Sequence, residues 1–170
     1  MKKSQFKPGD ILASRSNSFL SKAIRTMMHW YKDYADGYSH NAVIINGGLV
    51  AEALAGGVKV HSLEESGYLN NNNVAILRHK NGFTKSQLGR VTNKMLLLEG
   101  TRYQYGNLPL WVAKILFHID KFKGKSEKAI YCSELAAIAI NTAYPGTFPE
   151  PNKVSPADHI CNPIYETIKS

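Results

Sequence analysis

The chain has 170 residues, of which 44% are hydrophobic and 20% charged, and its formal net charge is +8. This length fits one domain with its own hydrophobic core, and the composition excludes a disordered or fibrous chain. No apolar run reaches the roughly 18 residues of a membrane span, and the two cysteines, Cys132 and Cys161, are too few for a disulfide scaffold.

The positive charge indicates attraction to polyanions such as cell-wall polymers or anionic lipid surfaces. Part of this charge lies in residues 121–128, just before Cys132. No helix-turn-helix, zinc-finger or RNA-binding motif accompanies it, so we expect no specific nucleic-acid binding. The oligomeric state is not set by any feature of the sequence.

The N-terminus has lysines but lacks the apolar segment of a signal peptide. We therefore expect a cytoplasmic, reducing location, in which both cysteines are free thiols. A single bridge between Cys132 and Cys161 is the alternative, and it would exclude Cys132 as a nucleophile.

The first predicted elements are a strand and a helix. Pro8-Gly9 marks a turn, and a short strand follows at residues 11–13. Apolar residues at helical spacing then predict a helix from about residue 17 or 18 to Lys32.

Three apolar runs separated by glycine pairs follow this helix. They cover residues 41–46, 49–54 and 58–63, with Gly47-Gly48 and Gly56-Gly57 between them. This pattern predicts a three-stranded antiparallel meander. A loop over residues 67–73 and a further strand over 74–78 come next.

The second half of the chain is mainly helical. Thr84 and Gln87 form a capping box for a helix that Gly100 ends. Pro109 begins a helix to about Asp120, and Ser155-Pro156 begins a last short helix. Because no repeat or linker divides the chain, we expect a single α+β domain over residues 1–170.

Cys132 stands at the start of the apolar, alanine-rich segment 135–140, which predicts a helix buried on most sides. In the first turn of a helix, free N–H groups and the helix dipole favour the thiolate, which attacks carbonyl groups. The alternative is that Cys132 is a small buried hydrophobe, since a lone cysteine needs a base before it becomes a nucleophile.

His40 is the candidate base and Glu52 the candidate third group that orients it. If Gly47-Gly48 were a two-residue loop, the two side chains would lie on opposite faces of the hairpin. A three-residue loop of Asn46, Gly47 and Gly48 pairs Ala42 with Glu52 and makes His40 and Glu52 diagonal neighbours on one face. The alternatives are a surface histidine and a glutamate on the solvent face of its strand.

Several segments together resemble the permuted NlpC-type papain-like cysteine amidases and peptidases, the YiiX-like group. The Cys-Ser-Glu-Leu element and the histidine-bearing strand carry most of the specificity, and the resemblance covers nearly the whole chain. The matching segments are residues 8–12, 39–48, 52–53, 56–58, 131–135 and 155–158. The resemblance implies an α+β, circularly permuted papain-like fold, with an antiparallel β-sheet or small barrel packed against a central cysteine-bearing helix.

By this resemblance Cys132 is the nucleophile, His40 the base and Glu52 the polar third member of a triad. The family often carries a Tyr-Asp pair ahead of the cysteine helix, and here the matching stretch is Tyr103-Gln104. An acid at that place is therefore not expected.

Three tyrosines are candidate substrate contacts. Tyr103 and Tyr105 precede the cysteine helix and are expected to line the cleft, and Tyr131 adjoins the nucleophile, where a packing role is favoured over a chemical one.

The expected function is hydrolysis of an amide bond in a small peptide or peptidoglycan-like substrate. Two alternatives share the scaffold: a lipid-directed thiol acyltransferase or esterase, for which the apolar segment 108–117 could contact lipid, and a non-catalytic binding module. No cofactor is expected, and the histidines lack a paired metal-ligand spacing.

Overall fold

The structure is a computed structural model that describes residues 2–15, 22, 26, 37–104 and 129–169. Three expectations fall outside the described residues: most of the helix up to Lys32, the helix that begins at Pro109, and the basic segment 121–128. Tyr105 and the apolar segment 108–117 also lie outside them.

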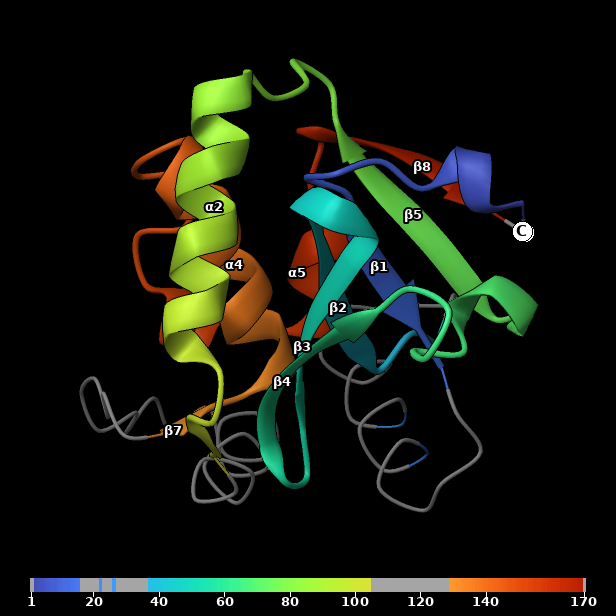
Figure 1. The fold of residues 1–170 in the computed structure, drawn as a ribbon. Coiled ribbons are helices and arrows are strands. Elements are labelled where there is room, and N and C mark those ends of the chain that lie inside the picture. Colours follow the sequence, from blue (N-terminus) through green and yellow to red (C-terminus); the bar gives the residue numbers. More distant parts are fainter. Residues whose placement is uncertain (1, 16–21, 23–25, 27–36, 105–128, 170) are drawn as a thin grey trace.

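A six-stranded sheet forms the centre of the molecule, and every neighbouring pair of strands is antiparallel. The order across the sheet is β4-β3-β2-β1-β5-β8 (Figure 1). The bounds are β1 Ile11–Ser14, β2 His40–Ile45, β3 Leu49–Leu54, β4 Gly57–Ser62, β5 Val74–His79 and β8 Tyr165–Lys169. The predicted meander is confirmed as β2, β3 and β4.

The turn between β2 and β3 has three residues, the length that the predicted triad needs. Asn46–Gly48 forms a short kinked turn, η2, with φ of 79° at Gly47 and 70° at Gly48, values that glycine adopts without strain. Ile45 pairs with Leu49 and Ala42 with Glu52. The predicted register is confirmed, and it places His40 and Glu52 on the same face of the hairpin.

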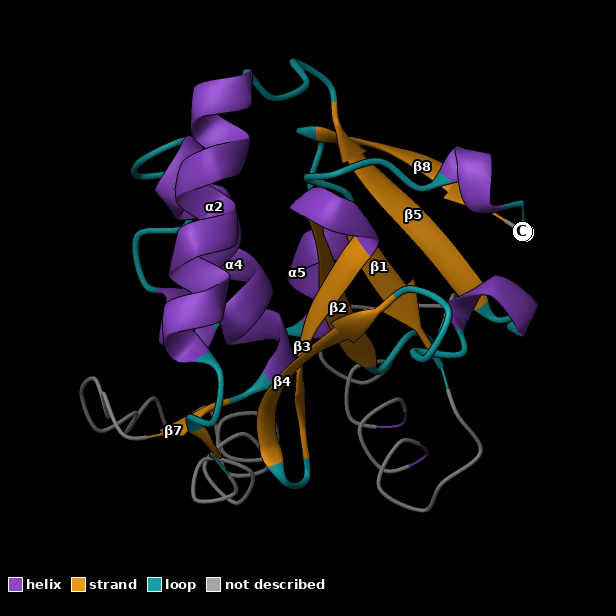
Figure 2. Cartoon of the chain, viewed as in Figure 1, coloured by secondary structure: helices purple, strands orange, loops and turns teal. Residues whose placement is uncertain are grey.

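Helices cover one face of the sheet (Figure 2). The helix α2 begins after its cap Thr84, whose side chain accepts from the Gln87 N–H as predicted, and it packs on α4. In turn, α4 packs on β2. The bounds are α2 Lys85–Leu98, α4 Cys132–Ala143 and α5 Pro156–Ile160, with β6 Arg102–Tyr103 and β7 Ala129–Ile130 forming a parallel pair before α4.

The sheet buries apolar side chains on both faces, because successive residues of a strand point to opposite sides. One cluster lies on the face that α2 and α4 cover, and it includes Ile11, Val43, Leu77, Leu135 and Ile140. The other cluster lies on the opposite face and includes Leu12, Ile44, Val50, Tyr68 and Ile76. Most residues of α4 are buried, as its apolar composition predicts.

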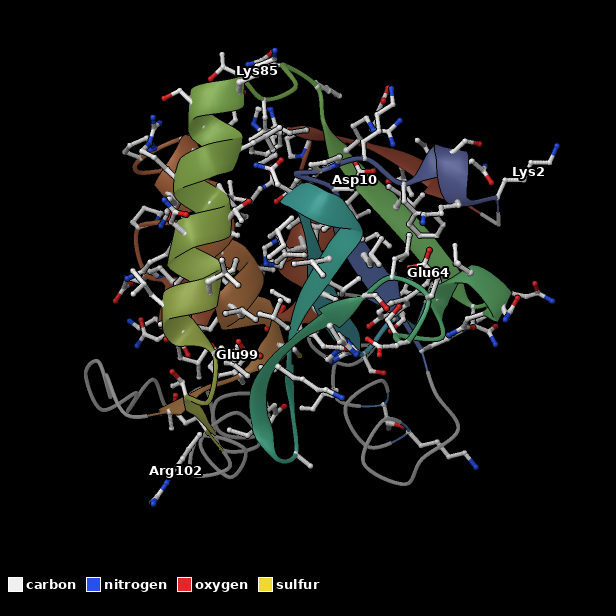
Figure 3. All side chains as sticks on the ribbon, in the orientation of Figure 1. Lys2, Asp10, Glu64, Lys85, Glu99 and Arg102 are labelled. Atoms are coloured by element: carbon white, nitrogen blue, oxygen red, sulfur yellow. The ribbon has the colours of Figure 1, made fainter. Side chains whose placement is uncertain are left out.

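Two side-chain contacts join parts of the chain that are distant in sequence. Asp10, labelled in Figure 3, is 2% exposed and accepts from Arg78 Nε at 2.9 Å and Nη2 at 2.7 Å, which fixes the turn before β1 against β5. Glu99, at the end of α2 in the same figure, accepts from the N–H of Val60 on β4 at 3.2 Å.

Three features of the described chain differ from the expectations, and the first is the short β6–β7 pair, which no sequence pattern predicted. The C-terminal segment forms an additional edge strand, β8, which pairs with β5. The predicted loop over 67–73 contains a 3₁₀ turn, η3 (Tyr68–Asn70), that buries Tyr68. Among the helices of the described residues, none is long and apolar enough to span a membrane.

Candidate active site

Cys132 is the first residue of α4, and Tyr131 is its N-cap. The side chain is 5% exposed. The sulfur accepts hydrogen bonds from the backbone N–H groups of Ser133 and Asn41. The β2–β3 ladder ends at Ala42 and Glu52, which leaves the Asn41 N–H available for the sulfur. The nucleophile candidate therefore lies where the N-terminus of α4 meets the start of β2.

His40 links Cys132 to Glu52. Its Nε2 atom lies 2.8 Å from Glu52 Oε2, and its ring also hydrogen-bonds to Cys132. An ionised carboxylate only accepts hydrogen bonds, so Nε2 carries the proton toward Glu52. This leaves Nδ1 for the thiol, in the tautomer that a general base requires.

The pKa values of the pair move in opposite directions. Burial raises the pKa of the Cys132 thiol, but the positive charge of His40 and the hydrogen bonds to the sulfur outweigh burial and bring this pKa below its ordinary value. Burial lowers the pKa of His40, but Cys132 and Glu52 outweigh burial and raise this pKa to about 10. The arrangement favours a thiolate beside an imidazolium.

Glu52 is 4% exposed, and both of its oxygens are hydrogen-bonded. Besides His40, Oε2 accepts from the Tyr68 hydroxyl at 2.8 Å, and Oε1 lies 2.7 Å from His61 Nε2. Burial raises the pKa of Glu52, but His40, Tyr68 and His61 together lower it below its ordinary value. The carboxylate therefore stays ionised inside the protein.

His61 and Tyr68 are not among the predicted site residues. A signal for His61 was present, because Glu52 pairs with Lys59 on β4 and His61 is two residues further along, hence on the same face. The register across the second glycine turn thus relates His61 to Glu52 as the register across the first relates His40 to it. Tyr68 lies in η3 outside the sheet, so no periodicity indicated it.

A second set of contacts fixes the N-terminus of α4 from behind. The Ser133 hydroxyl donates to the Val154 carbonyl at 2.8 Å, and His159 Nε2 donates to the Ser133 carbonyl at 2.9 Å. The Tyr131 hydroxyl donates to the carbonyl of Asn152. Cys132 is thus held on an anchored helix end, and preorganised catalytic groups need such support.

The predicted substrate contacts remain predictions. Tyr131 is 8% exposed, and its hydroxyl group bonds to main chain, in keeping with the packing role favoured for it. Tyr103 pairs with Ile130 in the β6–β7 ladder and packs against the core.

Both cysteines are free thiols, with Cys161 exposed and Cys132 buried.

One solved structure supports the fold assignment. The crystal structure of the metalloprotein YiiX from Escherichia coli O157:H7 superposes with a TM-score of 0.67 and 18% sequence identity, over 97% of this chain and 98% of that one. The chain has the YiiX fold. YiiX is a permuted NlpC/P60-like papain fold, so the predicted fold class is confirmed. No protein-family model and no curated sequence matches the chain.

The described residues do not form a metal centre of their own. The YiiX structure is titled a metalloprotein. In the part of this chain that the structure describes, no group of three or more His, Cys, Asp or Glu side chains is arranged to hold a metal ion. Both oxygens of Glu52 are occupied by histidine and tyrosine donors. These side chains fit a hydrogen-bonded network instead.

Proposed function

We propose that the protein is a cysteine-dependent amide hydrolase that acts on a small peptide or peptidoglycan-like substrate. The observation that carries the proposal is the chain of hydrogen bonds from the Cys132 sulfur through His40 to Glu52, at the N-terminus of a buried helix. A buried cysteine with only a structural role has no need of a base that a carboxylate orients.

In the proposed reaction the Cys132 thiolate attacks the amide carbonyl carbon, and the carbonyl π electrons move to oxygen. The Cys132 N–H, in the first helical turn where such groups lack intrahelical partners, is the proposed oxyanion donor. As the C–N bond breaks, His40 gives its Nδ1 proton to the leaving amine. A water molecule then loses a proton to His40 and attacks the thioester, which releases the acid and restores the thiolate.

The first test is the pH dependence of iodoacetamide labelling, resolved by mass spectrometry for each cysteine. Because Cys132 is buried and Cys161 exposed, the midpoint of each pH profile is compared instead of the absolute rate. We expect the Cys132 midpoint below the ordinary thiol value of about 8.5, because His40 and the hydrogen bonds to the sulfur lower its pKa. His40→Ala should bring the Cys132 midpoint to the ordinary value or above it.

Activity is then measured as release of amine from dipeptide amides and peptidoglycan fragments, with phospholipid vesicles assayed in parallel for acyl transfer. His40→Ala should lower kcat on the order of 10²–10⁴-fold, and Cys132→Ser should abolish turnover. An ordinary midpoint for Cys132 in the wild type would overturn the proposal. A low midpoint with turnover of lipid alone would replace it by acyl transfer, and a low midpoint with no turnover would favour a binding module.

A further inference from the structure

The Glu52 carboxylate has more partners than the triad requires. Three donors from three elements converge on its two oxygens: His40 of β2, His61 of β4 and Tyr68 of η3. His40 and His61 are diagonal neighbours of Glu52 on either side of β3, through the pairs Ala42–Glu52 and Glu52–Lys59. The hydroxyl of Ser14, on β1, hydrogen-bonds to Tyr68 in turn.

The additional donors are buried with the carboxylate. The side chain of His61 is 8% exposed and that of Glu52 is 6% exposed, whereas the side chain of His40, which adjoins Cys132, is 23% exposed. Tyr68 is buried as well, and burial raises the pKa of its phenol well above the ordinary value, so it stays a neutral donor. A buried carboxylate needs several donors to remain charged.

We propose that His61 and Tyr68 are positioning residues, which keep Glu52 ionised and directed at His40 and so sustain the thiolate of Cys132. This proposal rests on the proposed function, in which Glu52 orients the base. Without His61, Oε1 becomes a buried oxygen without a donor, and protonation of Glu52 is favoured. A protonated Glu52 no longer stabilises the imidazolium form of His40, and the thiolate of Cys132 loses its counter-charge.

Four variants separate positioning from structural support. His61→Ala removes the donor, and His61→Gln offers an amide N–H in a similar place. Tyr68→Phe removes the hydroxyl group that donates to the other carboxylate oxygen of Glu52, Oε2. Lys59→Ala is the matched control, because Lys59 lies directly opposite Glu52 in the ladder but its side chain is exposed, and none of the hydrogen bonds to Glu52 comes from it.

The main readout is the midpoint of the Cys132 alkylation profile, which needs no substrate. We expect His61→Ala and Tyr68→Phe to raise it toward the ordinary thiol value, His61→Gln to restore it in part, and Lys59→Ala to leave it in place. Where amide turnover is found, kcat should fall about 10- to 100-fold in His61→Ala with KM nearly unchanged. Circular dichroism identifies any variant that fails to fold.

Folded His61→Ala and Tyr68→Phe proteins with the wild-type midpoint would overturn the proposal. That result differs from failure of the proposed function, in which the wild-type midpoint is itself ordinary. If His61→Ala does not fold, the comparison of His61→Gln and Tyr68→Phe with the wild type still decides the question, because Tyr68→Phe tests the second oxygen independently.

Discussion

At the residue scale, Gly57 is a position that tolerates no side chain. Its φ is 112°, and a Cβ there would lie 2.6 Å from the carbonyl oxygen of Thr101. That same carbonyl accepts from the N–H of Val58 at 2.8 Å, so the loop after α2 cannot retreat without losing a hydrogen bond to β4.

We expect Gly57→Ala to lower the free energy of unfolding by roughly 2–4 kcal/mol, from backbone strain together with the clash. The neighbouring Gly56 is the control, since a Cβ at that position meets no atom within 4 Å. Gly56→Ala should change the free energy of unfolding by less than about 0.5 kcal/mol. Urea unfolding of both variants checks this, and equal effects would contradict it.

Some residues of the candidate site could be predicted from the sequence, and others could not. His40 and Glu52 were predictable as neighbours because both lie in strands joined by one short turn, whose length sets the register. Contact of this pair with Cys132 was inferred from the resemblance alone, because no local pattern relates a helix start to a distant strand. Tyr68 could not be found, because its place depends on how η3 folds back over the sheet.

At the element scale, α4 is fixed to the segment that follows it by the buried hydroxyl of Ser133. Its bond to the Val154 carbonyl connects two elements, and its removal leaves that buried carbonyl without this donor. Ser133→Ala should therefore lower the free energy of unfolding by about 1–3 kcal/mol.

The control is on the same helix. Thr142 donates to the Ile138 carbonyl, one turn earlier in α4, so its hydroxyl joins no second element. Thr142→Val should lower the free energy of unfolding by less than about 1 kcal/mol. Thermal and urea unfolding of the two variants provide the comparison, and an equal loss in both would show that the contact between elements contributes nothing beyond a local hydrogen bond.

Most elements with strong local signals were predictable, and those that depend on distant partners were not. The meander, β5, α2 and the start of α5 each carry glycine turns, capping residues or apolar periodicity of their own. β8 is an edge strand whose place is set by its pairing with β5. β6 and β7 are two residues each, and such short strands exist only through their pairing.

At the scale of the whole molecule, His159 makes stability depend on pH. It is fully buried, and its Nδ1 lies 3.2 Å from the Tyr165 hydroxyl while Nε2 donates to Ser133. Burial lowers the pKa of His159 to about 4. Since the unfolded chain binds this proton at a pKa of about 6.5, the folded state loses stability as the pH falls from about 6.5 to about 4.

The variant His159→Gln has no group that takes up this proton. The difference in the free energy of unfolding between the wild type and the variant should therefore shrink by about 3 kcal/mol as the pH falls from about 6.5 to about 4. Urea unfolding at several pH values measures it. Glu134 has the opposite effect on stability. Burial raises its pKa to about 7, so protonation of Glu134 stabilises the folded protein as the pH falls. Comparison of the two proteins cancels this effect, and a constant difference would contradict the prediction.

The nucleophile candidate and its base come from segments far apart in the chain, joined only when α4 packs on β2. During synthesis the His40 hairpin is complete long before Cys132 is added, and until α4 packs on β2 the new thiol has ordinary acidity. Under the proposed function, the thiol therefore becomes reactive only after α4 has packed on β2. Alkylation of Cys132 at acidic pH then counts native molecules in a mixed population.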